Sequence, residues 1–180
     1  MKAVERLRKM ERLFAAAEAG SARAPVEALD DPDWTVVQAA LHAIRLHPRA
    51  EYAGPVARVL ARQDELDIYG QTSDAKLNEV PRATKEVWKC RWRIKQAASH
   101  ALGAIGAACG RTALSEDALA RLRRWAADRE REDYHVRAAA CLALAQIRDP
   151  AARESLAMAA ADDEFCTRTE ARKALAVLGG

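Results

Sequence analysis

One pattern of apolar and small residues occurs four times along the chain. Its members stand at relative positions 0, 4, 7, 8 and 11, a spacing that places them on one stripe of a 3.6-residue helix. The copies are Val36, Ala40, Ala43, Ile44 and, as a departure, His47; Ile94, Ala98, Ala101, Leu102 and Ile105; Val136, Ala140, Ala143, Leu144 and Ile147; and Thr167, Ala171, Ala174, Leu175 and Leu178. This recurrence predicts a repeat protein, in which each unit buries its stripe against a neighbour.

A shorter apolar segment precedes each of these helices, over residues 25–29, 55–61, 116–127 and 150–161. Acidic turns at residues 30–33, 128–133 and 162–164 join the two parts in three copies, where carboxylates can cap helix amides and meet the helix dipole. The second copy lacks that turn. The unit is therefore a helical hairpin, and the sequence predicts about four of them.

The first residues of the chain form a different element. Residues 2–18 carry an apolar side made of Val4, Leu7, Met10, Leu13 and Phe14, and the rest of the segment is largely charged. The end unit of a helical repeat needs a polar outer face. We therefore expect residues 1–20 to be an N-terminal capping helix on a single all-α domain of residues 1–180.

Composition limits the classes of function. Hydrophobic residues make up 50% and charged residues 31% of the chain, as in soluble globular proteins. No apolar run approaches the roughly 18 residues of a membrane span, and the N-terminus has no apolar signal core. We therefore expect a cytoplasmic protein without a membrane partner.

Motifs for chemistry are absent from the sequence. It contains no Walker loop, GxGxxG, GxSxG or HExxH pattern, and its cysteines show no CxxC spacing. His42 and His100 occupy equivalent repeat positions, and a two-histidine metal or acid/base site is the strongest catalytic alternative to two solvated side chains. We expect no enzyme activity, no cofactor and no metal.

The unit resembles the HEAT repeat, in particular the bacterial HEAT-like repeats first associated with phycobilisome lyases, whose pattern is an acidic turn followed by VRxAAxxALGxIG. The likeness covers about residues 22–180 and is strongest at residues 94–106 and 133–140. It implies a right-handed α-α superhelix. It also implies a structural ladder, in which Lys95, Arg137 and Arg168 pair with acidic turns that contain Asp133 and Asp163. In the first repeat Val37 stands at the position of this basic residue, so the ladder should be broken there.

An insertion over residues 63–81 interrupts the second repeat, and loops of this length are usually functional or disordered. Pro81 then suits the start of a helix through Ala108. On that helix Lys85, Lys89 and Trp92 point nearly opposite the stripe, with Trp88 on the flank. These four residues are the candidate partner-binding site, and the alternative is that the tryptophans are covered within the fold.

Three functions are open at this stage. The first is a protein-binding scaffold that uses the concave face of the solenoid, since Trp and Arg are favoured interface anchors. The alternative is a nucleic-acid-binding module similar to the DNA-alkylation-repeat proteins, since lysines beside tryptophans suit phosphates and bases. A bilin lyase or chaperone is a third, suggested by the resemblance alone. The sequence leaves the partner and the oligomeric state open.

Overall fold

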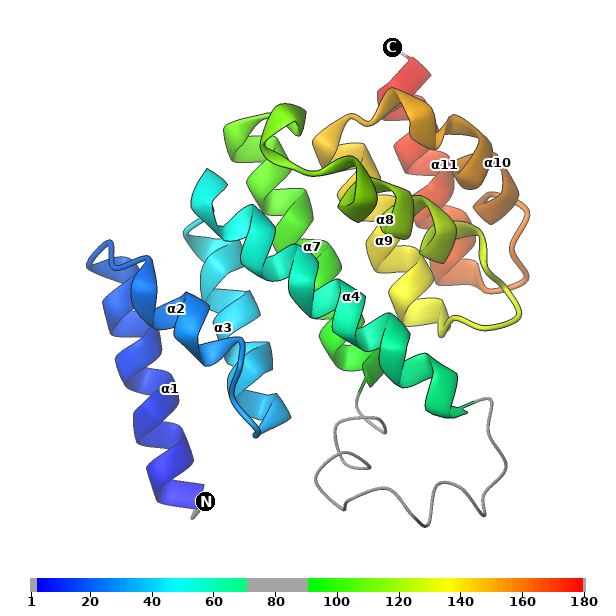
Figure 1. Ribbon diagram of the computed structural model, residues 1–180. Helices are drawn as coiled ribbons and strands as arrows, with labels where there is room; N and C mark the ends of the chain where they lie inside the picture. The colour runs from blue at the N-terminus through cyan, green and yellow to red at the C-terminus, as the bar shows by residue number, and fades with distance from the viewer. Residues whose placement is uncertain (1–2, 71–90, 180) are drawn as a thin grey trace.

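Helix pairs stacked side by side make up the protein (Figure 1). The computed structural model describes residues 3–70 and 91–179, and within these ranges the regular elements are all helical. The α-helices are α1 (Ala3–Glu18), α2 (Arg23–Ala28), α3 (Trp34–Leu46), α4 (Ala53–Gly70), α7 (Arg91–Cys109), α8 (Glu116–Ala127), α9 (Tyr134–Ile147), α10 (Arg153–Ala159) and α11 (Phe165–Gly179). The predicted all-α fold is confirmed: an N-terminal helix precedes the pairs α2/α3, α4/α7, α8/α9 and α10/α11.

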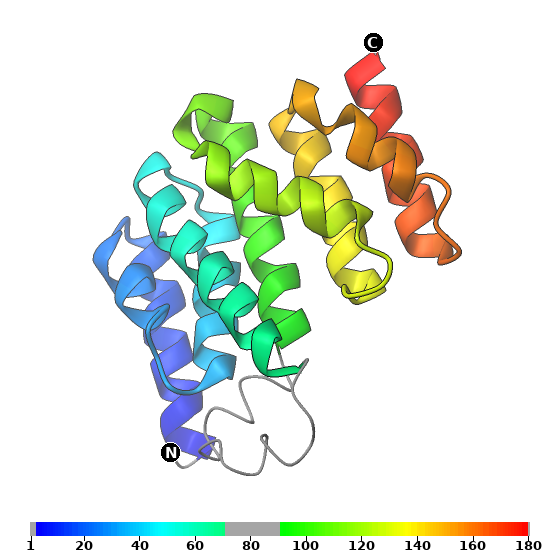
Figure 2. The same ribbon diagram turned by 45° about the vertical axis from the view of Figure 1, so that its right-hand side comes forward.

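The helices form two layers (Figure 2). The second helices of the pairs, α3, α7, α9 and α11, pack against one another in chain order, and α1 packs on α3. We call this row, α1 included, the second-helix layer. The first helices α2, α4, α8 and α10 cover one of its faces, whereas no helix within the described ranges covers the other.

The repeated stripe faces the first helices and forms the core. Val136, Ala140 and Leu144 on α9 are fully buried, as are the equivalent residues of α7. Small residues let these helices approach closely, because a Cβ added at Gly103 would lie 2.9 Å from the backbone Cα of Ala143. The departure at His47 has a simple explanation: α3 ends at Leu46, and His47 is its C-terminal cap.

Short polar side chains start the helices after the turns. Asp33 accepts a hydrogen bond from the Thr35 amide at 3.0 Å, and Asp133 accepts one from the His135 amide at 2.8 Å. These contacts satisfy amides that have no partner within the helix. Some carboxylates of the acidic turns are therefore local caps, as the sequence predicts.

The insertion begins later than the sequence suggested. A loop was expected from residue 63, but α4 continues to Gly70. Residues 63–69 contain no glycine or proline, so nothing in their backbone preference stops the helix before Gly70. Residues 71–81, and the helix expected to start at Pro81, lie outside the described residues.

None of the helices in the described part of the chain combines the length and the apolar character needed to span a membrane.

Candidate partner-binding surface

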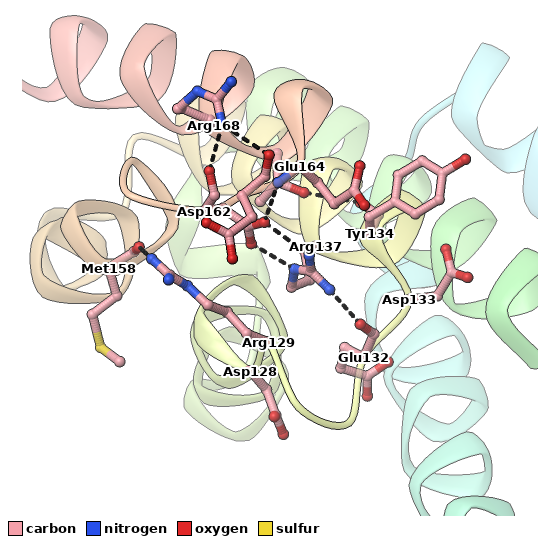
Figure 3. A network of polar contacts seen from close by, with 12 residues as sticks. Asp128, Arg129, Glu132, Asp133, Tyr134, Arg137, Met158, Asp162, Glu164 and Arg168 are labelled. Carbon is pink, nitrogen blue, oxygen red and sulfur yellow. Dashed lines mark hydrogen bonds and ion pairs between the residues drawn. The ribbon is translucent and has the colours of Figure 1, made fainter.

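The acidic turn between α10 and α11 is tied to α9 by a buried ion pair (Figure 3). The Arg137 guanidinium donates to both carboxylate oxygens of Asp162 at 2.8 and 2.9 Å, and to the Glu132 carbonyl at 2.5 Å. Burial by itself would raise the pKa of Asp162, but the hydrogen bonds from Arg137 and from the Glu164 amide lower it below its ordinary value. The paired charge thus holds one repeat to the next.

Lys95 makes the corresponding contact one repeat earlier. Its side chain is 1% exposed, its ammonium contacts the Glu132 carboxylate, and its Nζ lies 4.7 Å from the centre of the Trp125 ring. The aromatic face and the carboxylate together replace the water that a buried ammonium loses. Trp125 is itself buried, as a packing residue should be.

The acid partners differ from those that the resemblance suggested. Arg137 contacts Asp162 and Lys95 contacts Glu132, each one residue before the expected Asp163 and Asp133. Asp133 instead caps α9, because its carboxylate is held by the His135 amide and ring. In the last repeat Arg168 donates to the backbone carbonyls of Asp162 and Asp163, at 2.6 and 3.0 Å. Lys95 and Arg137 thus each reach the acidic turn of the following repeat, whereas Arg168 contacts the turn before its own helix. The shape of each turn decides which residue accepts the hydrogen bond.

Trp92 does not stand free on an outward face. It is half-buried against the core and stacks on the His135 ring, with centroids 4.9 Å apart. The reason is that α9 packs along that side of α7. The other candidate binding residues, Lys85, Trp88 and Lys89, lie outside the described residues.

An aromatic row nevertheless runs along the N-terminal ends of α3, α7 and α9. We define it as Trp34, Trp92, Arg93, Tyr134 and His135. The exposed Arg93 guanidinium lies 5.3 Å from the Trp34 ring centre and 5.0 Å from that of Trp92. His135 lies between Trp92 and Tyr134, with ring centroids 4.9 and 3.9 Å away. Tryptophan, tyrosine and arginine are the residue types that most often anchor protein interfaces.

A groove of about 510 Å³ lies on the second-helix layer, between α1, α3 and α7. Gln38 and His42 on α3 line it, and Gln96 and His100 line it at the equivalent positions on α7. Met10 and Phe14 of α1 supply apolar surface. Phe14 meets His42 edge to face, with centroids 5.9 Å apart. Thr35 and Gln96, which line the groove, lie close in the sequence to Trp34 and Arg93 of the aromatic row.

The sequence places His42 and His100 at equivalent repeat positions, but it did not predict the groove that they line. The sequence carries a detectable signal for it in the segments QAALH and QAASH, which repeat the same polar pair at positions 38–42 and 96–100. The participation of α1 had no such signal, because Met10 and Phe14 also suit a core stripe. Among the described residues, no group of three or more His, Cys, Asp or Glu side chains could hold a metal ion.

Neutral His100 is favoured at the wall of the groove. Burial lowers the pKa of His100, and the nearby Arg45 guanidinium lowers it further. An imidazole that resists protonation in the folded protein binds fewer protons than in the unfolded chain, so stability falls as the pH drops below about 6.5, the ordinary histidine pKa. We expect His100→Gln to flatten the loss of stability between about pH 7.5 and 5.5, as measured by urea unfolding. An unchanged pH dependence would contradict this assignment, and His42→Gln in the same groove serves as the matched variant.

Burial raises the pKa of the Cys141 thiol to about 12, with the Asp162 and Glu170 carboxylates adding to the effect. The thiol therefore stays protonated and is a packing group rather than a nucleophile.

The geometry defines a class of protein: an α-helical solenoid of stacked hairpins with polar contacts between adjacent turns. Residues 89–176, a range that runs from the start of α7 into α11, match the family model of HEAT repeats. HEAT repeats are helical scaffolds that typically mediate protein interactions. No curated protein matches the sequence.

Proposed function

We propose that the protein is a non-catalytic scaffold that binds a protein partner along the groove and the aromatic row. The groove carries the proposal, because it lies on the face of the second-helix layer that no described helix covers. Its glutamines and histidines offer hydrogen-bond donors and acceptors, and Met10 and Phe14 offer apolar contact area. A mixed polar and apolar lining of this kind suits a polypeptide, which presents both amide groups and side chains.

The position of the aromatic row extends this surface. Arg93 is exposed while its guanidinium is held over two indole rings, so it is oriented before a partner arrives. An oriented side chain loses less conformational entropy on binding than a free one. Together, the aromatic row would supply oriented side chains that contact the partner, and the groove would accommodate part of its chain.

A photo-crosslinking amino acid at Gln38 tests the proposal in the native lysate. Because Gln38 lines the groove, we expect it to form a crosslink to one defined protein that survives nuclease treatment. The same amino acid at Arg58, an exposed position on the first-helix layer, is the matched control and should give no such product. Equal products from both positions would contradict a groove-specific partner, and a nuclease-sensitive product would favour the nucleic-acid module instead.

A further inference from the structure

The break in the ladder at the first repeat leaves a pocket. Val37 occupies the same repeat position as Lys95. When the buried residues of α4 are aligned with those of α8, Val59 takes the position of Trp125. The two large side chains of the ladder contact, Lys95 and Trp125, are thus both replaced by valines between the first and second repeats. Both valines line a pocket of about 180 Å³, much larger than the ~30 Å³ that one water occupies in the liquid.

The pocket contains a buried acceptor without a donor. Gln63 lines it and is 5% exposed, and within the described residues nothing donates a hydrogen bond to its Oε1. Leaving such an atom unsatisfied is costly, so the site favours a guest that carries an N–H donor. The walls at Trp34, Val59 and Ile94 are apolar, so they suit an aliphatic chain behind that donor.

The groups around the pocket favour a compact donor. The Asp31 carboxylate lines the pocket with its side chain 5% exposed, but it already contacts the Lys9 ammonium and accepts a hydrogen bond from the Asp33 amide at 2.8 Å. The lining cation Arg62 already donates to Asp30 and to the Leu29 carbonyl, both at 2.8 Å. An arginine guest would bring five N–H donors in a rigid fork, more than these acceptors can satisfy, whereas an ammonium is compact.

We propose that this pocket binds a lysine side chain of the protein partner, which takes the place that Lys95 fills one repeat later. The inference rests on the proposed scaffold function and names one residue type that the partner must present. The aliphatic stem would lie against Val37, Val59 and Ile94, and the ammonium would donate to Gln63 Oε1 near Asp31.

The test uses N-acetyl-lysine methylamide as a probe, and N-acetyl-norleucine methylamide, which lacks the ammonium, as its control. Two-dimensional NMR of the whole protein would follow the Trp34 indole N–H and the Gln63 side-chain amide during titration. We expect saturable shifts with the lysine probe and at least about tenfold weaker binding of norleucine, because the charge-assisted hydrogen bond is absent. Gln63→Met should weaken lysine binding by a similar factor, and Gln38→Met in the groove should not.

Filling the pocket with a larger side chain provides an independent test. Val37→Met should remove the saturable shifts while the rest of the spectrum stays folded, and Val59→Met is the second variant if the first unfolds. Equal affinity for the two probes, or unchanged lysine binding in Gln63→Met, would overturn the inference. If the Gln38 crosslink forms but the lysine probe does not bind, the pocket inference fails alone; if the probe binds and no protein is crosslinked, the scaffold function fails.

Discussion

Arg137→Ala is expected to lower the free energy of unfolding by about 3–5 kcal/mol, the cost of removing one partner from a buried ion pair. The substitution leaves the Asp162 carboxylate, 2% exposed, without the two guanidinium hydrogen bonds that offset its burial. It also removes the donor to the Glu132 carbonyl. Urea unfolding at neutral pH, followed by circular dichroism, measures the change.

A surface pair provides the control for Arg137. Lys173 contacts Glu170 at 2.7 Å, but its side chain is 66% exposed, so Lys173→Ala should change stability by less than about 1 kcal/mol. The double variant Arg137→Met with Asp162→Leu should recover most of the loss, because it removes both buried charges together. A loss below about 1 kcal/mol in Arg137→Ala would show that the ladder contributes little to holding the repeats together.

Gly103→Ala is expected to destabilise the protein by about 1–3 kcal/mol, the usual cost of inserting extra volume into a packed core. Intrinsic helix propensity predicts the opposite sign, since alanine is favoured over glycine by about 1 kcal/mol. At Gly103 the new Cβ would lie 2.9 Å from the Cα of Ala143 and would also meet Gln146. Because the contact is with backbone, α7 and α9 would have to separate.

Gly54 offers a matched glycine in an open position. Among the residues that the structure describes, a Cβ there would have only the Arg58 side chain as a neighbour, at 4.0 Å, so Gly54→Ala should stabilise by about 0.4–1 kcal/mol. Thermal and urea unfolding of the two variants measure whether each substitution raises or lowers the free energy of unfolding. If Gly103→Ala were as stable as the parent, the close approach of α7 and α9 would not be needed for the fold.

Local patterns in the sequence were sufficient to predict the second helix of each repeat and its buried face. The stripe positions on α7 and α9 are buried as predicted, and Asp33 and Asp133 cap helices as their place in the turns indicates. The break at Val37 was also expected, although the pocket beside it was not. Helix periodicity and capping act over a few residues, and those residues are adjacent in the sequence.

The contacts between elements depended on the tertiary structure. The sequence suggested Asp163 for the ladder, yet Asp162 faces Arg137, because the turn between α10 and α11 decides which carboxylate points at α9. Trp92 was expected on an outward face, but α9 lies against that side of α7. The sequence by itself determined the repeated helices and their apolar faces, although it ended α4 before residue 63 instead of at Gly70. Only the tertiary structure decided which side chains meet across helices, because the turns and the spacing of neighbouring helices set those distances.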